Sequence, residues 1–303
     1  MTHLRLHADE PEIDAALVGR LLARQHPSFA ALPIERAEST GTDNAIYRLG
    51  GEFAARLPRR ATAAGQLARE ADWLPRLAPL LPLPIPVPLA LGEPGEGYPF
   101  AWGIYRWVEG EPAAADRIAN MDAAADALAA FVAALQGIDA SEAPRPDAAN
   151  AFRGTPLAPR DRATRAAIAQ LVGDIDTASA TAAWEAALAA PAHDGPPAWL
   201  HGDISPFNLV ARDGAIAAVI DFGCMAAGDP ACDLQVAWNL LTPAARARFR
   251  EHLAVGDAAW ARGRGWALSV ALIQLPYYRE TNPGLAANAR ETIAAILANA
   301  PGA

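Results

Sequence analysis

Three residues near the middle of the chain have the types and the spacing that phosphoryl transfer requires. Asp203 follows His201 and Gly202, and Asn208 comes five residues after Asp203. Asp221 begins an Asp-Phe-Gly triplet thirteen residues after Asn208. The transfer of a γ-phosphoryl group needs a carboxylate that orients the attacking hydroxyl and accepts its proton, and oxygen ligands that hold Mg²⁺ against the phosphates. Asp203 suits the first role, and Asn208 with Asp221 suits the second.

The segment between Asn208 and Asp221 predicts a β-hairpin. Residues 209 and 210 are apolar, residues 212–214 (Arg-Asp-Gly) are a turn signal, and residues 216–220 form an apolar run with Ile and Val. A hairpin brings its two ends together, so we expect both acidic sites at neighbouring strand ends.

The spacing matches that of the kinase catalytic loop and of the magnesium-binding triplet that follows it. Two departures bear on the substrate. Gly202 stands where protein kinases have the Arg that pairs with a phosphorylated activation loop, and no Ala-Pro-Glu sequence follows. Residues 228–230 (Gly-Asp-Pro) and Asp233 lie within twelve residues of Asp221, which leaves little room for an activation segment or a peptide-docking surface. We therefore expect a small-molecule acceptor and no regulation by loop phosphorylation.

Together these motifs resemble the signature of the aminoglycoside phosphotransferase family, which in its broad sense includes macrolide, homoserine, choline and fructosamine kinases. The resemblance spans residues ~30 to ~290 and rests on residues 201–208 (His-Gly-Asp-x4-Asn), 221–223 (Asp-Phe-Gly) and 228–234 (Gly-Asp-Pro-x2-Asp-Leu). The alternative is an accidental Asp-rich turn in a different α/β protein. The resemblance implies an α+β, protein-kinase-like bilobal fold, with ATP or GTP and Mg²⁺ as cofactors. Residues 1–107 would form a small antiparallel-sheet lobe that binds the nucleotide, and residues 108–303 a mostly helical lobe with the catalytic and acceptor site.

Length and composition are those of a globular chain with a sizeable core. The 303 residues are 52% hydrophobic and 19% charged. The net charge of −9 and the pI near 5.2 argue against nucleic acid as a partner, since phosphate backbones select basic surfaces. An acidic surface would favour a cationic substrate, although acidic cytosolic proteins are common.

Cysteine usage and the apolar segments indicate a cytoplasmic protein that does not enter a membrane. The spacing of the two cysteines, Cys224 and Cys232, fits no zinc site, and we expect both to be reduced and structural. Polar residues interrupt the N-terminal region, so no signal peptide is expected. The longest apolar candidate, residues 266–278, is shorter than the ~20 residues that a membrane span needs.

The N-terminal region predicts a helix followed by three antiparallel strands. Apolar residues at helical spacing predict the helix over residues 10–26. The strands are expected over residues 34–39, 45–49 and 52–57. The turn at residues 41–44 could bind phosphate oxygens through Thr42 and Asn44. The alternative is an ordinary hairpin turn.

The third of these strands is where the family carries a lysine that grips the nucleotide phosphates. Arg56 stands at that position, and all 25 basic residues of the chain are arginine. The planar guanidinium group bonds differently from an ammonium group, so nucleotide affinity or preference is expected to differ. Glu70 lies on the apolar stripe of a helix expected over residues 61–77, where an unpaired carboxylate would be costly. We expect Glu70 to pair with Arg56, and exposure of Glu70 is the alternative. Arg59 and Arg60 are further phosphate contacts or exposed side chains.

A proline-rich connector and a strand lead to the expected junction of the two lobes. Residues 81–89 alternate Pro with apolar residues, which is typical of an extended connector or an edge strand. Residues 98–107 predict a strand. In the family the backbone at this hinge pairs with the adenine edge, which implies nucleotide contacts for Arg106, Trp107 and Val108.

The remainder of the chain predicts helices around the catalytic residues. They are expected over residues 122–135, 161–188 with a break near Gly173, 234–249 and 257–278. His201 is assigned a structural role within its loop, and Asp233 is expected to accept hydrogen bonds from the backbone of that loop. Residues 160–162 line the acceptor site or form a solvated helix start.

The sequence therefore favours an ATP- or GTP-dependent small-molecule kinase, with an aminoglycoside-type antibiotic as the first candidate acceptor. A kinase of a macrolide or of a metabolite alcohol is the alternative with the same chemistry. A nucleotide-binding pseudokinase sensor that lost transfer through Arg56 is the alternative from another class. The retention of Asp203, Asn208 and Asp221 argues against that sensor.

Overall fold

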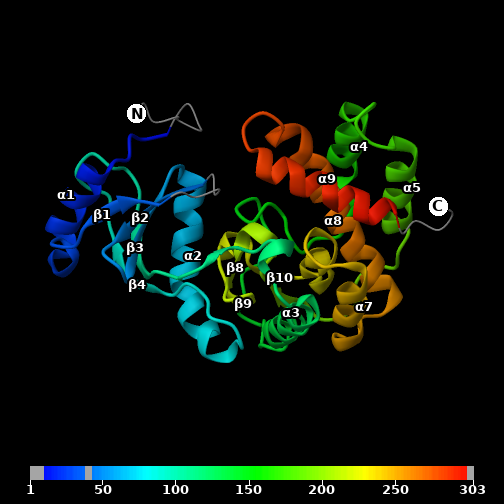
Figure 1. Ribbon diagram of the computed structural model, residues 1–303, viewed down its shortest axis with the longest axis horizontal. Helices are drawn as coiled ribbons and strands as arrows, with labels where there is room; N and C mark the ends of the chain where they lie inside the picture. Colours follow the sequence, from blue (N-terminus) through cyan, green and yellow to red (C-terminus); the bar gives the residue numbers. More distant parts are fainter. Residues whose placement is uncertain (1–9, 38–42, 299–303) are drawn as a thin grey trace. The chain divides into compact units, whose positions relative to one another are not determined.

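In the computed structural model, which describes residues 10–37 and 43–298, the chain divides into two compact units (Figure 1). The first comprises the described chain up to Leu80, Pro84–Glu109 and Ile220–Gly223. The second comprises Leu81–Leu83, Gly110–Val219 and the described chain from Cys224 onward. The Asp-Phe-Gly triplet therefore belongs to the unit that the N-terminal part of the chain forms.

The first unit is built on a five-stranded antiparallel sheet. In chain order the strands are β1 (Ile34–Arg36), β2 (Asn44–Leu49), β3 (Phe53–Pro58), β4 (Pro88–Gly92) and β5 (Trp102–Arg106). Their order in space is β1-β2-β3-β5-β4. Arg56 therefore lies on the central strand, where it is in register with Ile46 of β2 and Gly103 of β5.

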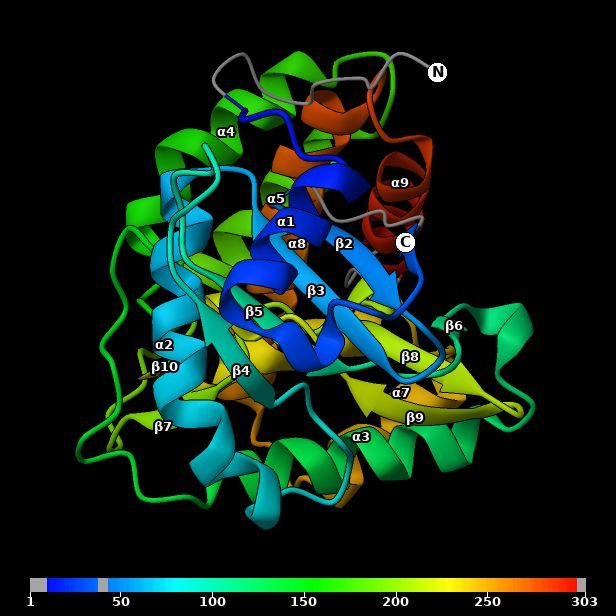
Figure 2. The ribbon, with the colours of Figure 1, turned by 90° about the vertical axis from the view of Figure 1, so that its left-hand side faces the viewer.

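Helix α1 (Ala15–Gln25) covers one face of this sheet, as Figure 2 shows. Its buried residues recur at helical spacing and are Leu17, Val18, Leu21 and Leu22. They pack with Tyr47 and Trp102 of the sheet. The helix begins later than residue 10, because the Asp14 carboxylate caps it by accepting a hydrogen bond from the N–H of Leu17 at 2.7 Å.

Helix α2 and strand β4 complete the first unit. Helix α2 (Ala61–Leu77) has the bounds that the sequence predicts, and it buries Glu70 together with Leu67 and Leu74. The proline-rich segment leads into β4, which ends the sheet beside β5. An edge position tolerates proline, since one side of such a strand needs no N–H donors.

Two small antiparallel sheets carry residues 201–208 in the second unit. Strands β7 (Ala198–Leu200) and β10 (Ala226–Gly228) form one, and β6 (Glu111–Pro112), β8 (Leu209–Arg212) and β9 (Ala215–Val219) form the other. β8 and β9 are the predicted hairpin. Its turn residues Asp213 and Gly214 have φ values of 53° and 79°, the left-handed conformation of tight hairpin turns.

Helices make up most of the second unit. They are α3 (Met121–Gln136), α4 (Asp161–Gln170), α5 (Thr177–Leu188), α6 (Val236–Asn239), α7 (Pro243–His252), α8 (Asp257–Tyr278) and α9 (Pro283–Leu297). The predicted break near Gly173 separates α4 from α5. Helix α8 has the predicted bounds, and it packs against α4, α5 and α9 (Figure 1).

The structure differs from the helical pattern in two places. Residues 234–249 form no single helix, because α6 ends at Asn239 and Thr242 caps a new helix with Pro243 at its first position. The sequence pattern also did not predict α9, which Asn282 caps by accepting a hydrogen bond from the N–H of Leu285. Both α7 and α9 begin with a capping residue followed by proline. The predicted helices were based on apolar periodicity, which does not register this start signal.

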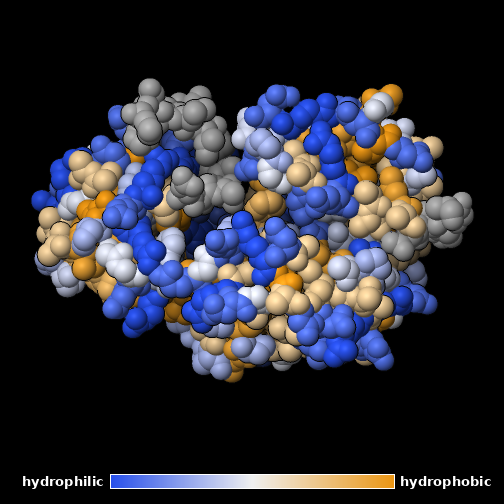
Figure 3. Space-filling model, in the orientation of Figure 1, coloured by the Kyte–Doolittle hydropathy of each residue, from blue (hydrophilic) through white to orange (hydrophobic). Residues whose placement is uncertain are grey.

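The surface mixes hydrophilic and apolar residues on the face seen in Figure 3. The large apolar side chains that are exposed include Leu89 and Leu91 on β4 and Tyr277 on α8. No helix within the described ranges is both long enough and apolar enough to span a lipid bilayer.

Candidate active site

One buried carboxylate anchors the start of the loop of residues 201–208. Asp233 accepts hydrogen bonds from the backbone N–H groups of His201 and Gly202, both at 2.7 Å. The side chains of Asp233 and His201 are fully buried. Burial raises the pKa of Asp233, while His201 and the two N–H groups oppose that rise. The predicted contact of Asp233 with the loop backbone is therefore confirmed.

Replacement of Asp233 by asparagine is expected to lower the free energy of unfolding by about 1–3 kcal/mol. The amide has one acceptor oxygen for two buried N–H groups, and each unsatisfied group costs about 1–3 kcal/mol. Denaturant titration measures the change. Asp213→Asn is the matched control, because the Asp213 side chain is 93% exposed in the hairpin turn. Equal stability of the two variants would contradict the role of Asp233.

His201 and Gly202 shape the same loop. Nδ1 of His201 accepts a hydrogen bond from the backbone N–H of Asp203 at 3.2 Å, so His201 has the structural position that we expected. Gly202 has a φ of 86°, and a Cβ at this position would lie 2.5 Å from the carbonyl oxygen of Cys224. The arginine that protein kinases carry at this position would therefore collide with the backbone.

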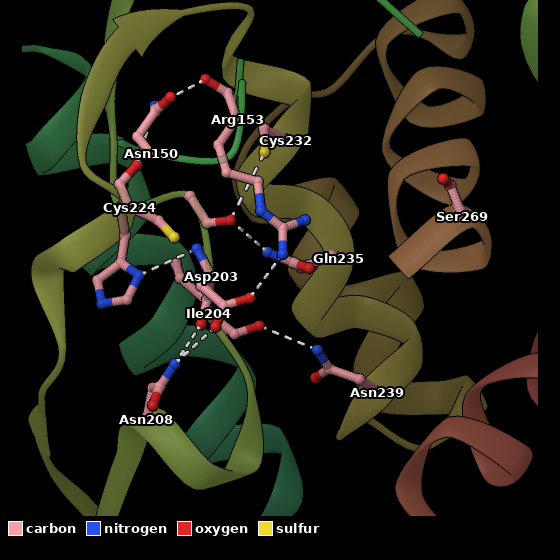
Figure 4. A network of polar contacts seen from close by, with 12 residues as sticks. Asn150, Arg153, Asp203, Ile204, Asn208, Cys224, Cys232, Gln235, Asn239 and Ser269 are labelled. Carbon is pink, nitrogen blue, oxygen red and sulfur yellow. Dashed lines mark hydrogen bonds and ion pairs between the residues drawn. The ribbon is translucent and has the colours of Figure 1, made fainter. Parts of the chain in front are cut away.

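Two amide side chains bind carbonyl groups of the loop, and neither was among the predicted site residues. Nε2 of Gln235 donates to the Gly202 carbonyl at 3.2 Å, and Nδ2 of Asn239 donates to the Ile204 carbonyl at 2.9 Å (Figure 4). Gln235 ends the 3-10 helix Pro230–Gln235, and Asn239 ends α6. Their only signal in the sequence is that they follow the Asp-Leu motif closely.

The carboxylate of Asp203 is held at both of its oxygens. Oδ2 accepts a hydrogen bond from Nδ2 of Asn208 at 3.0 Å, and Oδ1 accepts one from Nη2 of Arg153 at 3.2 Å (Figure 4). The Asp203 side chain is nevertheless 29% exposed. A carboxylate that is fixed in direction and open on one side can accept a proton from a bound hydroxyl group. Arg153 was not among the predicted site residues.

The side-chain amide oxygen of Asn208 suits a magnesium ion. Its Nδ2 donates to the carbonyl and to the carboxylate of Asp203, at 2.9 Å and 3.0 Å. Its amide oxygen takes no part in these bonds, and Mg²⁺ binds such oxygens together with carboxylates, phosphates and water. Asp221, the second predicted ligand, has a φ of 63° and a side chain that is 46% exposed. Within residues 10–37 and 43–298, no three His, Cys, Asp or Glu side chains gather into a metal site.

Arg56 forms the predicted ion pair with Glu70 in the first unit. Nη1 of Arg56 donates to Oε2 of Glu70 at 2.6 Å, and both side chains are buried. Nη2 of Arg56 lies 3.8 Å from Oδ1 of Asp221. Asn44 completes the group, because its amide oxygen, in the orientation that satisfies both side chains, accepts from Nε and Nη2 of Arg56 at 3.1 Å. The fork of the guanidinium group thus contacts three side chains at once.

Burial and charge act in opposite directions on this pair. Burial raises the pKa of Glu70 to about 7, although the neighbouring Arg56 lowers it. Burial would lower the pKa of Arg56, but Glu70, Tyr105 and Asp221 outweigh that effect and hold it above its ordinary value. The guanidinium group therefore stays charged throughout the physiological range.

The other predicted nucleotide contacts are placed differently. Thr42 lies outside the described residues. Asn44 begins β2 beside Arg56 and so does not lie in a turn. Arg106 is the exposed last residue of β5, and Val108 is half-buried after it. The backbone N–H of Trp107 donates to the carbonyl of Glu52 at 2.8 Å, so the sheet already uses this donor.

Arg59 and Arg60 are not the solvated side chains that we expected by default. Arg59 is buried and forms an ion pair with Glu10. Arg60 forms an ion pair with Asp43. Their partners lie 49 and 17 residues away in the sequence, and no local pattern indicates such distant pairs.

Comparison with known proteins identifies the family of the chain. The family model described as the phosphotransferase enzyme family matches residues 34–266, which is more than half of the chain. The chain belongs to the phosphotransferase enzyme family. This membership confirms the expected enzyme class, a small-molecule kinase. A search of curated protein sequences finds no match.

Solved structures of phosphotransferases share the fold over nearly the whole chain. A GDP complex of an aminoglycoside 2'-phosphotransferase-IIIa mutant is 19% identical, with a TM-score of 0.73 over 94% of this chain and 98% of that chain. The GDP and kanamycin complex of APH(2")-IIia is 18% identical, with a TM-score of 0.71 over 94% and 99%. The macrolide 2'-phosphotransferase MphH from Brachybacterium faecium is 26% identical, with a TM-score of 0.59 over 96% and 99%. The expected kinase-like fold, with an antiparallel-sheet N-terminal part and a helical C-terminal part, is confirmed.

Proposed function

We propose that this phosphotransferase moves the γ-phosphoryl group of ATP or GTP to a hydroxyl group of a small molecule. The observation that carries the proposal is the state of Asp203. Its carboxylate is fixed by Asn208 and Arg153, it remains partly exposed, and its loop is anchored by Asp233. In this role Asp203 orients the acceptor hydroxyl and takes its proton as the new bond to phosphorus forms.

Asn208 and Asp221 are the proposed magnesium ligands. Both supply hard oxygen atoms, which are the ligands that Mg²⁺ takes in nucleotide-dependent phosphotransferases. The ion would neutralise charge on the phosphate oxygens as the γ-phosphoryl group transfers. Arg56, held by Glu70 and Asn44, is proposed to steady the phosphates with a planar fork in place of the usual ammonium group.

The remaining nucleotide contacts stay predictions from the family resemblance. They are the Thr42 side chain and the backbone of Arg106, Trp107 and Val108. In this proposal, residues 1–107 bind the nucleotide, and residues 108–303 carry Asp203 and bind the acceptor.

The proteins with the same fold suggest the first acceptors to test. APH(2")-IIia forms a complex with GDP and kanamycin, and the enzyme from Brachybacterium faecium is a macrolide 2'-phosphotransferase. Aminoglycosides are therefore the first candidates, and macrolides and metabolite alcohols follow. A pseudokinase sensor would bind nucleotide without transferring phosphate.

The deciding experiment measures nucleotide turnover with Mg²⁺ against a panel of aminoglycosides, macrolides and metabolite alcohols. We expect one class to stimulate turnover and Asp221→Ala to lower that stimulated rate by at least about 10²-fold, since the ion stabilises the charge that develops on the phosphate. Asp213→Ala, an exposed change in the hairpin turn, is the control. Full activity of Asp221→Ala would contradict the magnesium assignment. Tight nucleotide binding without stimulation by any acceptor would favour the sensor.

A further inference from the structure

One arginine contacts Asp203 on the side away from Asn208, and a second arginine lies next to the first. Arg153 uses Nη2 to contact Oδ1 of Asp203, whereas Asn208 contacts Oδ2 (Figure 4). The side chain of Arg153 is only 10% exposed. Its Nε and Nη1 are buried, and in the described part of the chain the other hydrogen-bond partner of this guanidinium group is the Cys224 thiol, which is a weak acceptor. Arg153 therefore has donors that the folded chain satisfies only weakly.

Arg160 is the second arginine, and it is held in place without a carboxylate. Its Nε donates to Oγ of Ser269 at 2.9 Å, and the Thr164 hydroxyl lies 2.7 Å from the same oxygen. Among residues 10–37 and 43–298, Arg160 has no acidic partner within ion-pair distance. Burial and the neighbouring charge of Arg153 together lower the pKa of Arg160 to about 10. The Arg160 guanidinium group is therefore a cation without a carboxylate partner in the described part of the chain.

A shared aromatic ring links the two guanidinium groups. Arg160 lies 4.7 Å and Arg153 5.7 Å from the ring centre of Trp266. Two cations on one indole, with a single carboxylate at one end, leave the group with a net positive charge. A bound carboxylate or phosphate stabilises two neighbouring guanidinium groups, because each planar fork can donate two parallel hydrogen bonds to such an oxyanion.

The position of these arginines points to the acceptor and not to the nucleotide. Asn208, the proposed metal ligand, occupies one oxygen of Asp203, and Arg153 occupies the other. The hydroxyl that Asp203 activates and the group that Arg153 binds would then belong to one molecule. The nearby carboxylates are already engaged, since Asp229 pairs with Arg262 at 2.7 Å and Asp233 binds backbone N–H groups. A polycationic acceptor would find little negative charge here beyond Asp203.

We infer that Arg153 and Arg160 bind an anionic oxygen group of the acceptor, a carboxylate or a phosphate, beside the hydroxyl that receives the phosphoryl group. The inference rests on the proposed function, and it narrows the acceptor to a hydroxy acid or a phosphorylated alcohol. Among the candidate acceptors of the proposed function, it therefore favours anionic metabolite alcohols over the aminoglycosides, which are polycations. No covalent step beyond the proposed phosphoryl transfer is involved.

A binding experiment tests the oxyanion site without turnover. Sulfate is titrated calorimetrically into the full-length protein that is saturated with Mg²⁺ and a non-hydrolysable ATP analogue. We expect saturable binding that Arg160→Gln weakens about 10- to 100-fold, the loss of one charged hydrogen-bonding partner. Arg162→Gln is the matched control, because Arg162 is an exposed arginine two residues further on, in the first turn of α4. No saturable binding, or binding that the ATP analogue abolishes, would overturn the inference, and the latter would assign the arginines to the nucleotide phosphates.

A kinetic experiment identifies the source of the anion. Turnover is compared for matched acceptors, D-glycerate with glycerol, D-gluconate with sorbitol and glycerol 3-phosphate with glycerol, and for kanamycin. We expect the anionic member of a pair to be preferred and Arg160→Gln to raise its KM about 10- to 100-fold, with kcat and the nucleotide KM within about threefold. If Arg160→Gln impaired the turnover of anionic and neutral acceptors equally, Arg160 would have only a structural role, and the inference would be contradicted. Kanamycin as the preferred acceptor, unaffected by Arg160→Gln, would do the same.

Two further variants keep the test decisive if Arg160→Gln fails to fold. Arg160→Lys keeps the charge but loses the fork, and Ser269→Ala removes the anchor of Arg160, so both should weaken sulfate binding less than the glutamine variant. Failure of the proposed function gives a different pattern from failure of this site. Sulfate binding without turnover on any acceptor would contradict the kinase alone, and turnover on kanamycin without sulfate binding would contradict the site alone.

Discussion

Replacement of Asp203 by asparagine is expected to lower kcat for acceptor phosphorylation by about 10²- to 10⁴-fold, the range for loss of a general base. Asparagine keeps the size of the side chain and one acceptor oxygen for Arg153 or Asn208, but it cannot take a proton. Nucleotide affinity should change by less than about threefold, because the lost interaction belongs to the transition state. Steady-state kinetics and a nucleotide titration measure the two quantities.

Asp213→Asn is the control for this variant, since it makes the same chemical change at an exposed turn of the neighbouring hairpin. Circular dichroism and thermal unfolding would establish that both variants are folded. A collapse of nucleotide binding together with kcat would show that Asp203 holds the nucleotide or the loop. That result would remove the assigned role of proton acceptor.

Replacement of Glu70 by alanine is expected to lower the free energy of unfolding by about 3–5 kcal/mol. The change leaves Arg56 buried without its main counter-ion, and breaking a buried ion pair from one side costs that much. Denaturant titration measures the loss. Nucleotide affinity should also fall, because Arg56 would no longer be held in one orientation.

A double variant separates the structural from the functional part of this effect. Replacing Arg56 by methionine and Glu70 by leucine removes both charges and fills most of the space, and such exchanges are often neutral or stabilising. We expect the double variant to regain most of the stability that Glu70→Ala loses and to remain defective in nucleotide binding. Recovery of nucleotide binding as well would mean that Arg56 does not contact the phosphates.

The features that could be predicted from the sequence are those that short segments determine. Helices α2 and α8 have the predicted bounds, because apolar residues recur at helical spacing along them. The hairpin of β8 and β9 follows from the Asp-Gly turn between two apolar runs. The pairing of Glu70 with Arg56 was predictable for a different reason. A carboxylate on an apolar helix face requires a cation, and Arg56 was the natural candidate.

The features that were missed depend on contacts between distant parts of the chain. Arg153 meets Asp203 across 50 residues, and Arg160 meets Ser269 across 109. Arg59 pairs with Glu10, which lies 49 residues earlier, and this pairing accompanies the burial of its side chain. No periodicity or spacing records such pairs. They follow from how helices and loops pack, which a single sequence does not reveal.

The Arg56–Glu70 pair also changes which reagents can label the proposed nucleotide site covalently. Amine-reactive nucleotide probes need a lysine at this position, and a guanidinium group that stays protonated at neutral pH is a poor nucleophile. The side chains of this protein offer no primary amine at all, because its 25 basic residues are all arginine. Profiling of kinases with such probes would therefore pass over this enzyme, and lysine-directed covalent inhibitors would leave its nucleotide site untouched.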